Sequence, residues 1–363
     1  MTEPVNVLPS DLPLQCLYRW ERERGDDIFL TQPMGAGQVQ DITWAQAADQ
    51  ARRIATWLQA QGWPEGSRVA IIGKNSAHWI LADLAILMAG YVSVPIYPTF
   101  NGEALAYILA HSEAKACFVG KMDGVENLET GIPADMPLIT MPLAPMRKSL
   151  LWTDLLAHNA PLAGTPAPPM DALCTIIYTS GTTGKPKGVV QTFRAIAWAL
   201  SSATRRVKMG DNERYISYLP LAHVAERMLI EQGALRFGGH IFFAESLDTF
   251  VQDLQRARPT VFFSVPRLWV KFQQGVFAKM PAKKLKRLLG IPLIGGIVRR
   301  KILKGLGLDQ CRIAAGGAAP MPADVLQWYR KLGLDLIEVY GMTENCGVSH
   351  ATLPGGRDTG SVG

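Results

Sequence analysis

Residues 174–188 read Cys-Thr-Ile-Ile-Tyr-Thr-Ser-Gly-Thr-Thr-Gly-Lys-Pro-Lys-Gly. The first five are β-branched, aromatic or apolar and predict a short buried strand. The ten that follow predict a phosphate-binding loop, because hydroxyls and backbone N–H groups can face an anion and glycine permits close approach. The spacing differs from the Walker A pattern, which needs Gly-x-x-x-x-Gly-Lys-Ser/Thr. A solvated turn is the alternative reading, since Ser, Thr, Gly and Pro are ordinary loop residues.

Three later segments carry further candidate residues. They are Tyr218-Leu-Pro-Leu-Ala-His-Val-Ala-Glu226, Gly316-Gly-Ala-Ala-Pro320 and Tyr340-Gly-Met-Thr-Glu344. With 178–188 they resemble, in the same order, the signatures of the adenylate-forming (AMP-binding) superfamily of acyl-CoA synthetases, peptide-synthetase adenylation domains and luciferases. The sequences of residues 217–223, 261–267 and 340–344 are most similar to those of long-chain fatty acyl-CoA synthetases. Less specific motifs at 42–44 and 87–95 extend the resemblance over nearly the whole chain.

This resemblance implies a two-step reaction. ATP and a fatty acid form an acyl-adenylate, and CoA then takes the acyl group as a thioester. The β- and γ-phosphates would lie against the loop, with these residues: Thr179, Ser180, Gly181, Thr182, Thr183, Gly184 and Lys187. Glu344 is the expected Mg²⁺ ligand, because magnesium accepts carboxylate and phosphate oxygens. Thr343 is expected at the α-phosphate.

His223 is expected near the acyl carboxylate and the α-phosphate, where it would orient the acid and offset charge. A lone histidine at an element boundary is more often structural, and only its motif favours the functional reading. Tyr340 is expected to stack on adenine, with a core aromatic as the alternative, and Glu338 to face the adenine edge. The other expected nucleotide-binding residues are Gly316, Gly317, Ala318 and Gly341, although a tight turn also explains such glycines.

Two features depart from the family pattern. Arg227 stands four residues after His223, where some fatty acyl synthetases have an aromatic gate, so chain-length preference cannot be transferred. The sequence also stops soon after the magnesium motif, at Gly360-Ser-Val-Gly363. We therefore expect residues 1–363 to be an incomplete N-terminal AMP-binding domain without the mobile C-terminal domain. Little or no ligase activity is expected from this chain alone.

Helical and extended patterns alternate along the chain. Strands are expected near 68–73, 91–96, 116–119, 215–218, 241–243, 261–265, 312–315 and 336–339. Such βα repetition predicts an α/β fold with two mostly parallel lobes packed together. The approximate limits are 65–205 for a phosphate-loop lobe, and 1–60 plus 212–345 for an acyl and adenine lobe.

Composition fits a globular protein of 363 residues, of which 48% are hydrophobic. Five cysteines lie far apart without a Cys-x-x-Cys pair, so neither zinc nor a disulfide framework is predicted. The N-terminal residues lack the basic and apolar pattern of a secretory signal, and a cytoplasmic location is expected. Residues 79–97 are apolar enough to suggest a membrane span, but their change from helical to extended pattern favours a buried helix and strand.

The basic charge is concentrated in one region. Between Asp253 and Asp309 there are thirteen Lys or Arg and no acidic residue, against a net charge of +6 for the whole chain. Residues 279–304 interleave these charges with apolar residues, as a helix on the inner, anionic face of a membrane would. A solvated basic face is an equal alternative. Nucleic-acid binding is not expected, because aromatic residues are sparse there.

Two other functions stay open at this stage. One is a noncatalytic nucleotide- or acyl-binding module of the same fold, and the other is an enzyme that adenylates another carboxylic acid. A kinase or NTPase is disfavoured because its phosphate and base motifs are absent.

Overall fold

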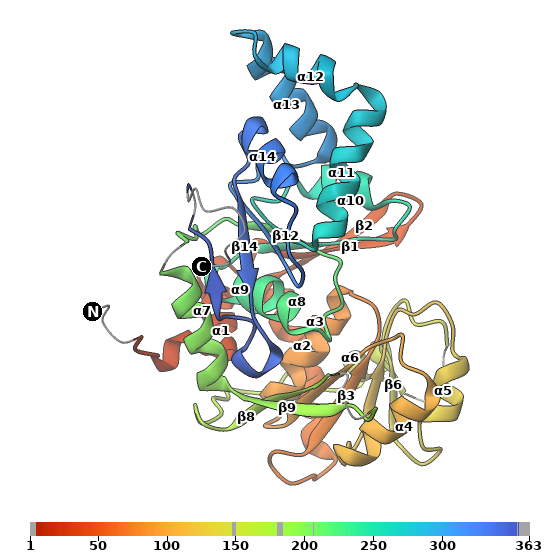
Figure 1. Cartoon of the computed structure of the whole chain (residues 1–363). Helices are drawn as coiled ribbons and strands as arrows, with labels where there is room; N and C mark the ends of the chain where they lie inside the picture. The colour runs from red at the N-terminus through yellow and green to blue at the C-terminus, as the bar shows by residue number, and fades with distance from the viewer. Residues whose placement is uncertain (1–4, 147–149, 180–183, 206, 354, 356–363) are drawn as a thin grey trace.

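The computed structural model describes residues 5–146, 150–179, 184–205, 207–353 and 355. Within these ranges the strands form three sheets with helices packed against them (Figure 1). Neighbouring strands are parallel except for one antiparallel pair at an edge of each sheet. The predicted α/β class with mostly parallel sheets is confirmed.

The largest described sheet has seven strands in the order β7-β6-β5-β3-β4-β8-β9. Their bounds are β3 (Arg68–Ile72), β4 (Val92–Ile96), β5 (Cys117–Val119), β6 (Leu138–Thr140), β7 (Leu150–Leu151), β8 (Leu173–Thr179) and β9 (Lys187–Thr192). β8 is the strand predicted ahead of the phosphate loop. β9 was not predicted; it pairs antiparallel with β8 and closes a hairpin.

Two four-stranded sheets complete the described β-structure, in the orders β10-β11-β1-β2 and β12-β13-β14-β15. The first contains β1 (Ile28–Gly35), β2 (Gln38–Thr43), β10 (Arg214–Ser217) and β11 (His240–Phe243). The second contains β12 (Val261–Ser264), β13 (Ile313–Gly317), β14 (Leu336–Tyr340) and β15 (His350–Ala351). The N-terminal hairpin β1–β2 therefore joins strands that follow it by about two hundred residues. The division of the chain into two lobes with the stated limits stays a prediction.

Helices connect the strands. The first half of the chain contains α1 (Pro13–Arg24), α2 (Trp44–Ala60), α3 (Ala77–Met88), α4 (Gly102–His111), α5 (Glu126–Gly131) and α6 (Trp152–His158). The second half contains α7 (Phe193–Thr204), α8 (Val224–Glu226), α9 (Gly233–Phe237), α10 (Phe250–Ala257), α11 (Pro266–Lys279), α12 (Ala282–Leu289), α13 (Ile294–Leu306) and α14 (Ala323–Leu332). Shorter turns are the 3₁₀ turns η1 (Pro9–Asp11) and η3 (Thr343–Asn345), and the π-helical turn η2 (Arg227–Gln232).

Local sequence signals explain several boundaries. α2 begins after Thr43, whose hydroxyl accepts from the Gln46 N–H while the Gln46 side chain accepts from the Thr43 N–H. This reciprocal cap fixes the start of the helix.

Every residue of α3 is buried, and β4 follows it after a turn, so the apolar stretch 79–97 forms a buried helix and strand as predicted. No helix in the described ranges is long and apolar enough to cross a membrane.

The main core includes the buried rings of Trp44, Trp79 and Trp152, and a second core surrounds Trp269 and Tyr329. All five cysteines are free thiols. α12 and α13 project from one end of the molecule, away from the seven-stranded sheet (Figure 1).

Candidate functional site

The predicted phosphate loop is the tip of the β8–β9 hairpin. Thr179 ends β8 and pairs in register with Lys187, whose exposed side chain lies at the start of β9. Gly184 has φ of 88°, a conformation that glycine adopts without steric cost. The predicted residues Ser180, Gly181, Thr182 and Thr183 lie outside the described ranges. The structure thus places the base of the loop, with Thr179 and Lys187 side by side.

The β8–β9 hairpin is tied to the segment that holds Thr343 and Glu344. The buried Gln191 of β9 donates from Nε2 to the Thr343 carbonyl oxygen at 2.6 Å. Thr343 is partly buried and Glu344 is exposed at the surface of η3. Two motifs separated by about 150 residues in the chain are therefore neighbours in the fold.

Gly341 is required by the backbone around η3. A β-carbon at this position would overlap the carbonyl oxygen of Gly347. The turn closes through a hydrogen bond from the Gly347 N–H to the Met342 carbonyl at 2.8 Å, and Gly347 itself has φ of 74°. This close approach gives the motif glycine a structural role that does not depend on a ligand.

His223 lies between β10 and α8, at the element boundary that the sequence indicated. It caps α8, because its Nδ1 accepts from the Ala225 N–H at 3.1 Å. A ring nitrogen that accepts a hydrogen bond carries no proton, so the imidazole is neutral with its proton on Nε2. Burial also lowers the pKa of His223 below its ordinary value. A β-carbon on Gly347 would lie 3.8 Å from the Val224 methyl carbons, so the His223 segment adjoins the turn after Glu344.

The predicted adenine-wall residues lie on paired strands. Gly316 of β13 is in register with Glu338 of β14, and Gly317 with Val339. A β-carbon on Gly317 would come within 2.7 Å of a Val339 methyl group, so internal packing already accounts for this glycine. Ala318, just beyond the strand, is exposed with φ of 66°.

The two remaining adenine candidates differ in burial. Glu338 is buried, whereas Tyr340 is 48% exposed at the end of β14 and lies 6.1 Å from the His350 ring. The exposed ring argues against the core-aromatic alternative for Tyr340. The predicted contacts of both residues with a nucleotide stay predictions.

The described residues contain no group of three or more His, Cys, Asp or Glu side chains able to enclose a metal. Glu344 is a single exposed carboxylate. This donor set fits magnesium, which commonly binds through one or two carboxylates together with substrate phosphates and water.

A family model described as AMP-binding enzyme matches residues 17–363. The chain belongs to the AMP-binding enzyme family. The resemblance carried by the four motifs is thereby confirmed.

Relatives of this AMP-binding chain include fatty-acid ligases. It is 29% identical to a protein of Xenopus laevis named long-chain-fatty-acid–CoA ligase ACSBG2, over 91% of this chain and 50% of that protein. It is 31% identical to long chain acyl-CoA synthetase 6, peroxisomal, of Arabidopsis thaliana, over 90% of this chain and 51% of that protein. The chain thus spans about half the length of these relatives.

Solved structures support the fold. A benzoate CoA ligase from Burkholderia xenovorans LB400 superposes with a TM-score of 0.75 at 21% identity, covering 97% of this chain and 65% of that one. The likeness shows a shared architecture, which agrees with the predicted AMP-binding fold.

Two residues that organise the candidate site were not predicted from the sequence. One is Gln191, described above, and the other is Asn75. Asn75 follows β3 and is buried next to the His223 segment. Its Nδ2 donates to Ser217 Oγ at 2.8 Å and to the Leu219 carbonyl at 2.6 Å, and its Oδ1 accepts from the Leu221 N–H. An asparagine three residues after a buried strand was the available signal, but its partners are about 145 residues away.

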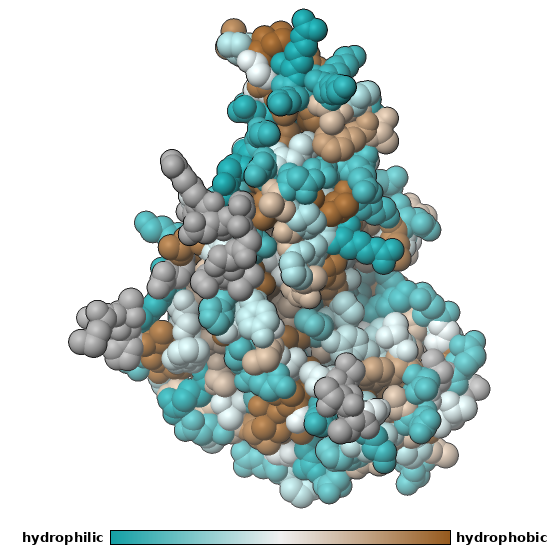
Figure 2. All heavy atoms as spheres, in the orientation of Figure 1, coloured by the Kyte–Doolittle hydropathy of each residue, from teal (hydrophilic) through white to brown (hydrophobic). Residues whose placement is uncertain are grey.

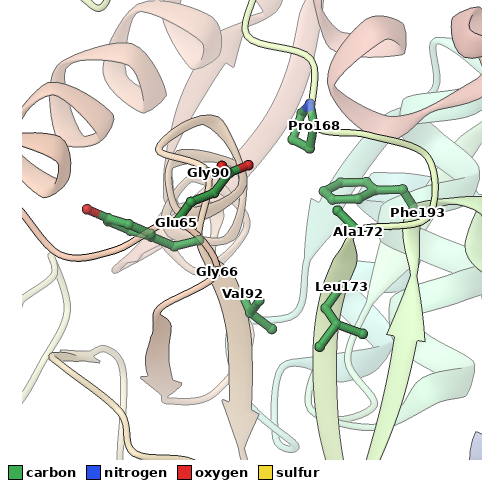
Figure 3. Close-up of a pocket in the computed structure, with 9 residues that line it drawn as sticks. Glu65, Gly66, Gly90, Val92, Pro168, Ala172, Leu173 and Phe193 are labelled. Carbon is green, nitrogen blue, oxygen red and sulfur yellow. The ribbon is translucent and has the colours of Figure 1, made fainter.

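A separate pocket of about 130 Å³ lies at the amino ends of β4 and β8 in the seven-stranded sheet (Figure 3). Its walls include Val92 and Leu173, at the amino ends of β4 and β8, together with Phe193. Ligands of open α/β sheets bind at the carboxyl ends of the strands, where Thr179 lies. The pocket is also smaller than the 300 Å³ or so of a typical ligand site. It is therefore not the candidate nucleotide site.

Proposed function

We propose that the protein carrying this chain is a long-chain fatty acid–CoA ligase, which uses ATP to form an acyl-adenylate and then transfers the acyl group to CoA. Family membership supports adenylate chemistry, and the names of the relatives support a fatty acid as the substrate. The observation that carries the proposal is the Gln191–Thr343 hydrogen bond, which joins the phosphate-loop hairpin to the segment with Glu344.

Each motif receives a role in this proposal. The loop hydroxyls and N–H groups of 179–184, with Lys187, hold the β- and γ-phosphates. Thr343 binds the α-phosphate, and Glu344 holds magnesium together with phosphate oxygens. ATP and a carboxylate are both anions, and negative charge accumulates when they occupy one site. The metal and the cations offset this charge.

His223 acts as a hydrogen-bond donor. With Nδ1 occupied by the Ala225 N–H, the proton on Nε2 is available to the fatty-acid carboxylate or the α-phosphate. A carboxylic acid is already ionised at neutral pH, so no general base is needed for its attack on phosphorus. Orientation of the two reactants is therefore the contribution of this residue.

The adenine lies between Tyr340 and the end of β13 in this proposal. The exposed Tyr340 ring offers a stacking surface, and the buried Glu338 faces the adenine edge. Gly316, Gly317, Ala318 and Gly341 allow the ligand to approach the backbone. The protein is proposed to act in the cytoplasm.

The decisive experiment is ATP–pyrophosphate exchange that depends on a carboxylic acid. It compares long-chain, short-chain and aryl acids with this chain and with a version extended to the length of its relatives. Exchange driven by long-chain acids in the extended protein, reduced about 100-fold by His223→Ala, is the expected result. His158→Ala, at an exposed histidine, is the matched control.

Other outcomes identify the alternatives. Exchange driven only by short-chain or aryl acids would assign the protein to a different carboxylic acid. Nucleotide binding without exchange by the extended protein would assign it to the noncatalytic class.

A further inference from the structure

The hairpin of α12 and α13 presents two different faces. Val298, Ile302 and Leu306 recur at helical spacing on α13 and pack against the second core. Leu285 of α12 is buried beside them. These contacts anchor the hairpin to the body, and the opposite face of α13 is left to solvent.

The tip of the hairpin exposes four large apolar side chains within seven residues. Their exposed fractions are 37% for Ile291, 89% for Leu293, 43% for Ile294 and 68% for Ile297. Leu293 also has φ of 67°, which costs energy for a residue with a β-carbon. The fold thus accepts backbone strain at a residue whose side chain extends into solvent. Figure 2 shows hydrophobic and hydrophilic surface side by side at this end of the molecule.

Cationic side chains surround these apolar residues. Those of 279–304 are Lys279, Lys283, Lys284, Lys286, Arg287, Arg299, Arg300, Lys301 and Lys304. None of them forms an ion pair with another described residue. Because residues 254–308 contain no Asp or Glu, the hairpin carries an uncompensated positive charge.

Apolar and cationic residues are ordered along one face of α13. Leu293, Ile297, Arg300, Lys301 and Lys304 line a groove of about 490 Å³. At 1.5 Å per residue, Ile297 lies about 6 Å beyond Leu293 along the helix, and Lys301 about another 6 Å. On this face the apolar residues therefore lie at the start of α13, next to the hairpin turn, and the three cations follow toward the end of the helix.

We propose that the α12–α13 hairpin docks the protein on an anionic phospholipid membrane. Interfacial segments bury apolar side chains about 5–10 Å into a bilayer while cations meet the lipid phosphates, and the order along α13 matches this depth profile. A nucleic acid would use the cations but not Leu293 and Ile297. The docking proposal rests on the proposed function in one respect: it explains why membrane binding would be useful. Long-chain acids partition into membranes, and a ligase docked there would take up its substrate directly.

Vesicle cosedimentation of the whole chain tests this proposal. Vesicles of phosphatidylcholine with phosphatidylserine should bind the protein, and pure phosphatidylcholine or high salt should weaken the binding. The triple variant Arg300→Glu, Lys301→Glu, Lys304→Glu should lower the partition coefficient about 100-fold, because each cation near such a surface adds about five-fold. The double variant Leu293→Asp, Ile297→Asp should lower it at least about 10-fold, even at low salt.

Matched controls introduce the same kinds of substitution outside the hairpin. Arg22→Glu, Lys115→Glu, Lys208→Glu alters three exposed cations outside the hairpin and outside α14, the helix that contacts α13. Leu247→Asp alters a leucine that is 92% exposed. Both controls should bind vesicles as the unchanged protein does, and urea unfolding checks that every variant is folded.

Three results would overturn the docking proposal. They are no binding to anionic vesicles, hairpin variants that bind like the controls, or binding to duplex DNA that needs the cations but not Leu293 and Ile297. Vesicle binding requires no nucleotide. If it fails while acid-dependent exchange persists, the docking proposal is wrong and the proposed function stands.

Discussion

Arg227 holds its charge inside the fold, where its side chain is 1% exposed. One terminal nitrogen donates to both oxygens of Asp83 at 2.6 Å, and the other donates to Thr175 Oγ1 at 3.0 Å. Glu231 lies beside this pair, and burial followed by the Asp83 charge raises its pKa well above the ordinary value. A neutral Glu231 leaves one cation balanced by one anion. The position of the aromatic gate of some fatty acyl synthetases is thus occupied by a structural ion pair.

Arg227→Ala should lower the free energy of unfolding by about 3–5 kcal/mol, because it leaves Asp83 buried without its counter-charge. Urea titration at neutral pH measures this loss. Arg194→Ala is the control: Arg194 also contacts both oxygens of a carboxylate, Asp171, but both side chains are largely exposed to solvent, so the loss should be much smaller than that of Arg227→Ala. Equal losses for the two variants would contradict the assignment.

Glu226 makes the stability of the His223 segment depend on pH. Its carboxyl group accepts from Ser217 Oγ and the Tyr218 N–H, each at 2.8 Å, yet burial raises its pKa to about 8. The folded state therefore keeps this group protonated where the unfolded state has lost the proton. The resulting stability is complete below the unfolded pKa, near 4.5, and is lost as the pH rises through about 8.

Relative to Glu226→Gln, the unchanged protein should lose stability between these two values by up to about 1.4 kcal/mol per pH unit. Urea titrations of both proteins across this range provide the comparison. A difference that is constant with pH, or that grows in favour of the unchanged protein, would show that Glu226 is ionised in the fold.

At the scale of elements, the turn from β14 through η3 depends on the contact between Gly341 and Gly347. Gly341→Ala should displace Thr343 and Glu344 from β9 and lower ATP affinity at least about 10-fold, since the added methyl group overlaps the Gly347 carbonyl. Equilibrium dialysis with labelled ATP measures the affinity.

Gly275→Ala is the matched control for this prediction. Gly275 lies in α11 with no atom within 4 Å of an added β-carbon, so the change should leave ATP affinity unaltered and stabilise the helix by about 0.5–1 kcal/mol. If both variants bound ATP equally, the turn would not be part of the nucleotide site.

At the scale of the whole molecule, the chain spans about half the length of its relatives and supplies both the phosphate-loop hairpin and the η3 turn. We predict that it binds ATP weakly and forms little or no acyl-CoA alone. Acyl-CoA formation with ATP, a long-chain acid and CoA should rise at least about 100-fold in the extended protein. Robust thioester formation by this chain alone would refute the prediction.

The sequence alone determined the local elements and the family. Strand β8 and the buried α3 followed from side-chain pattern within a few residues. The four motifs identified the AMP-binding family, because their residue types and order are visible without coordinates. The long stretch without Asp or Glu, which includes α12 and α13, was also visible in the sequence alone.

Only the tertiary structure decided which distant residues meet. It paired β9 with β8, joined Gln191 to Thr343, placed Asn75 beside the His223 segment and buried Arg227 against Asp83. These contacts join residues up to about 150 positions apart, and neither periodicity nor capping carries information over that distance. The physical reason is that a polar side chain becomes buried wherever the packed layers supply a hydrogen-bond partner, and the layers exist only once the whole chain has folded.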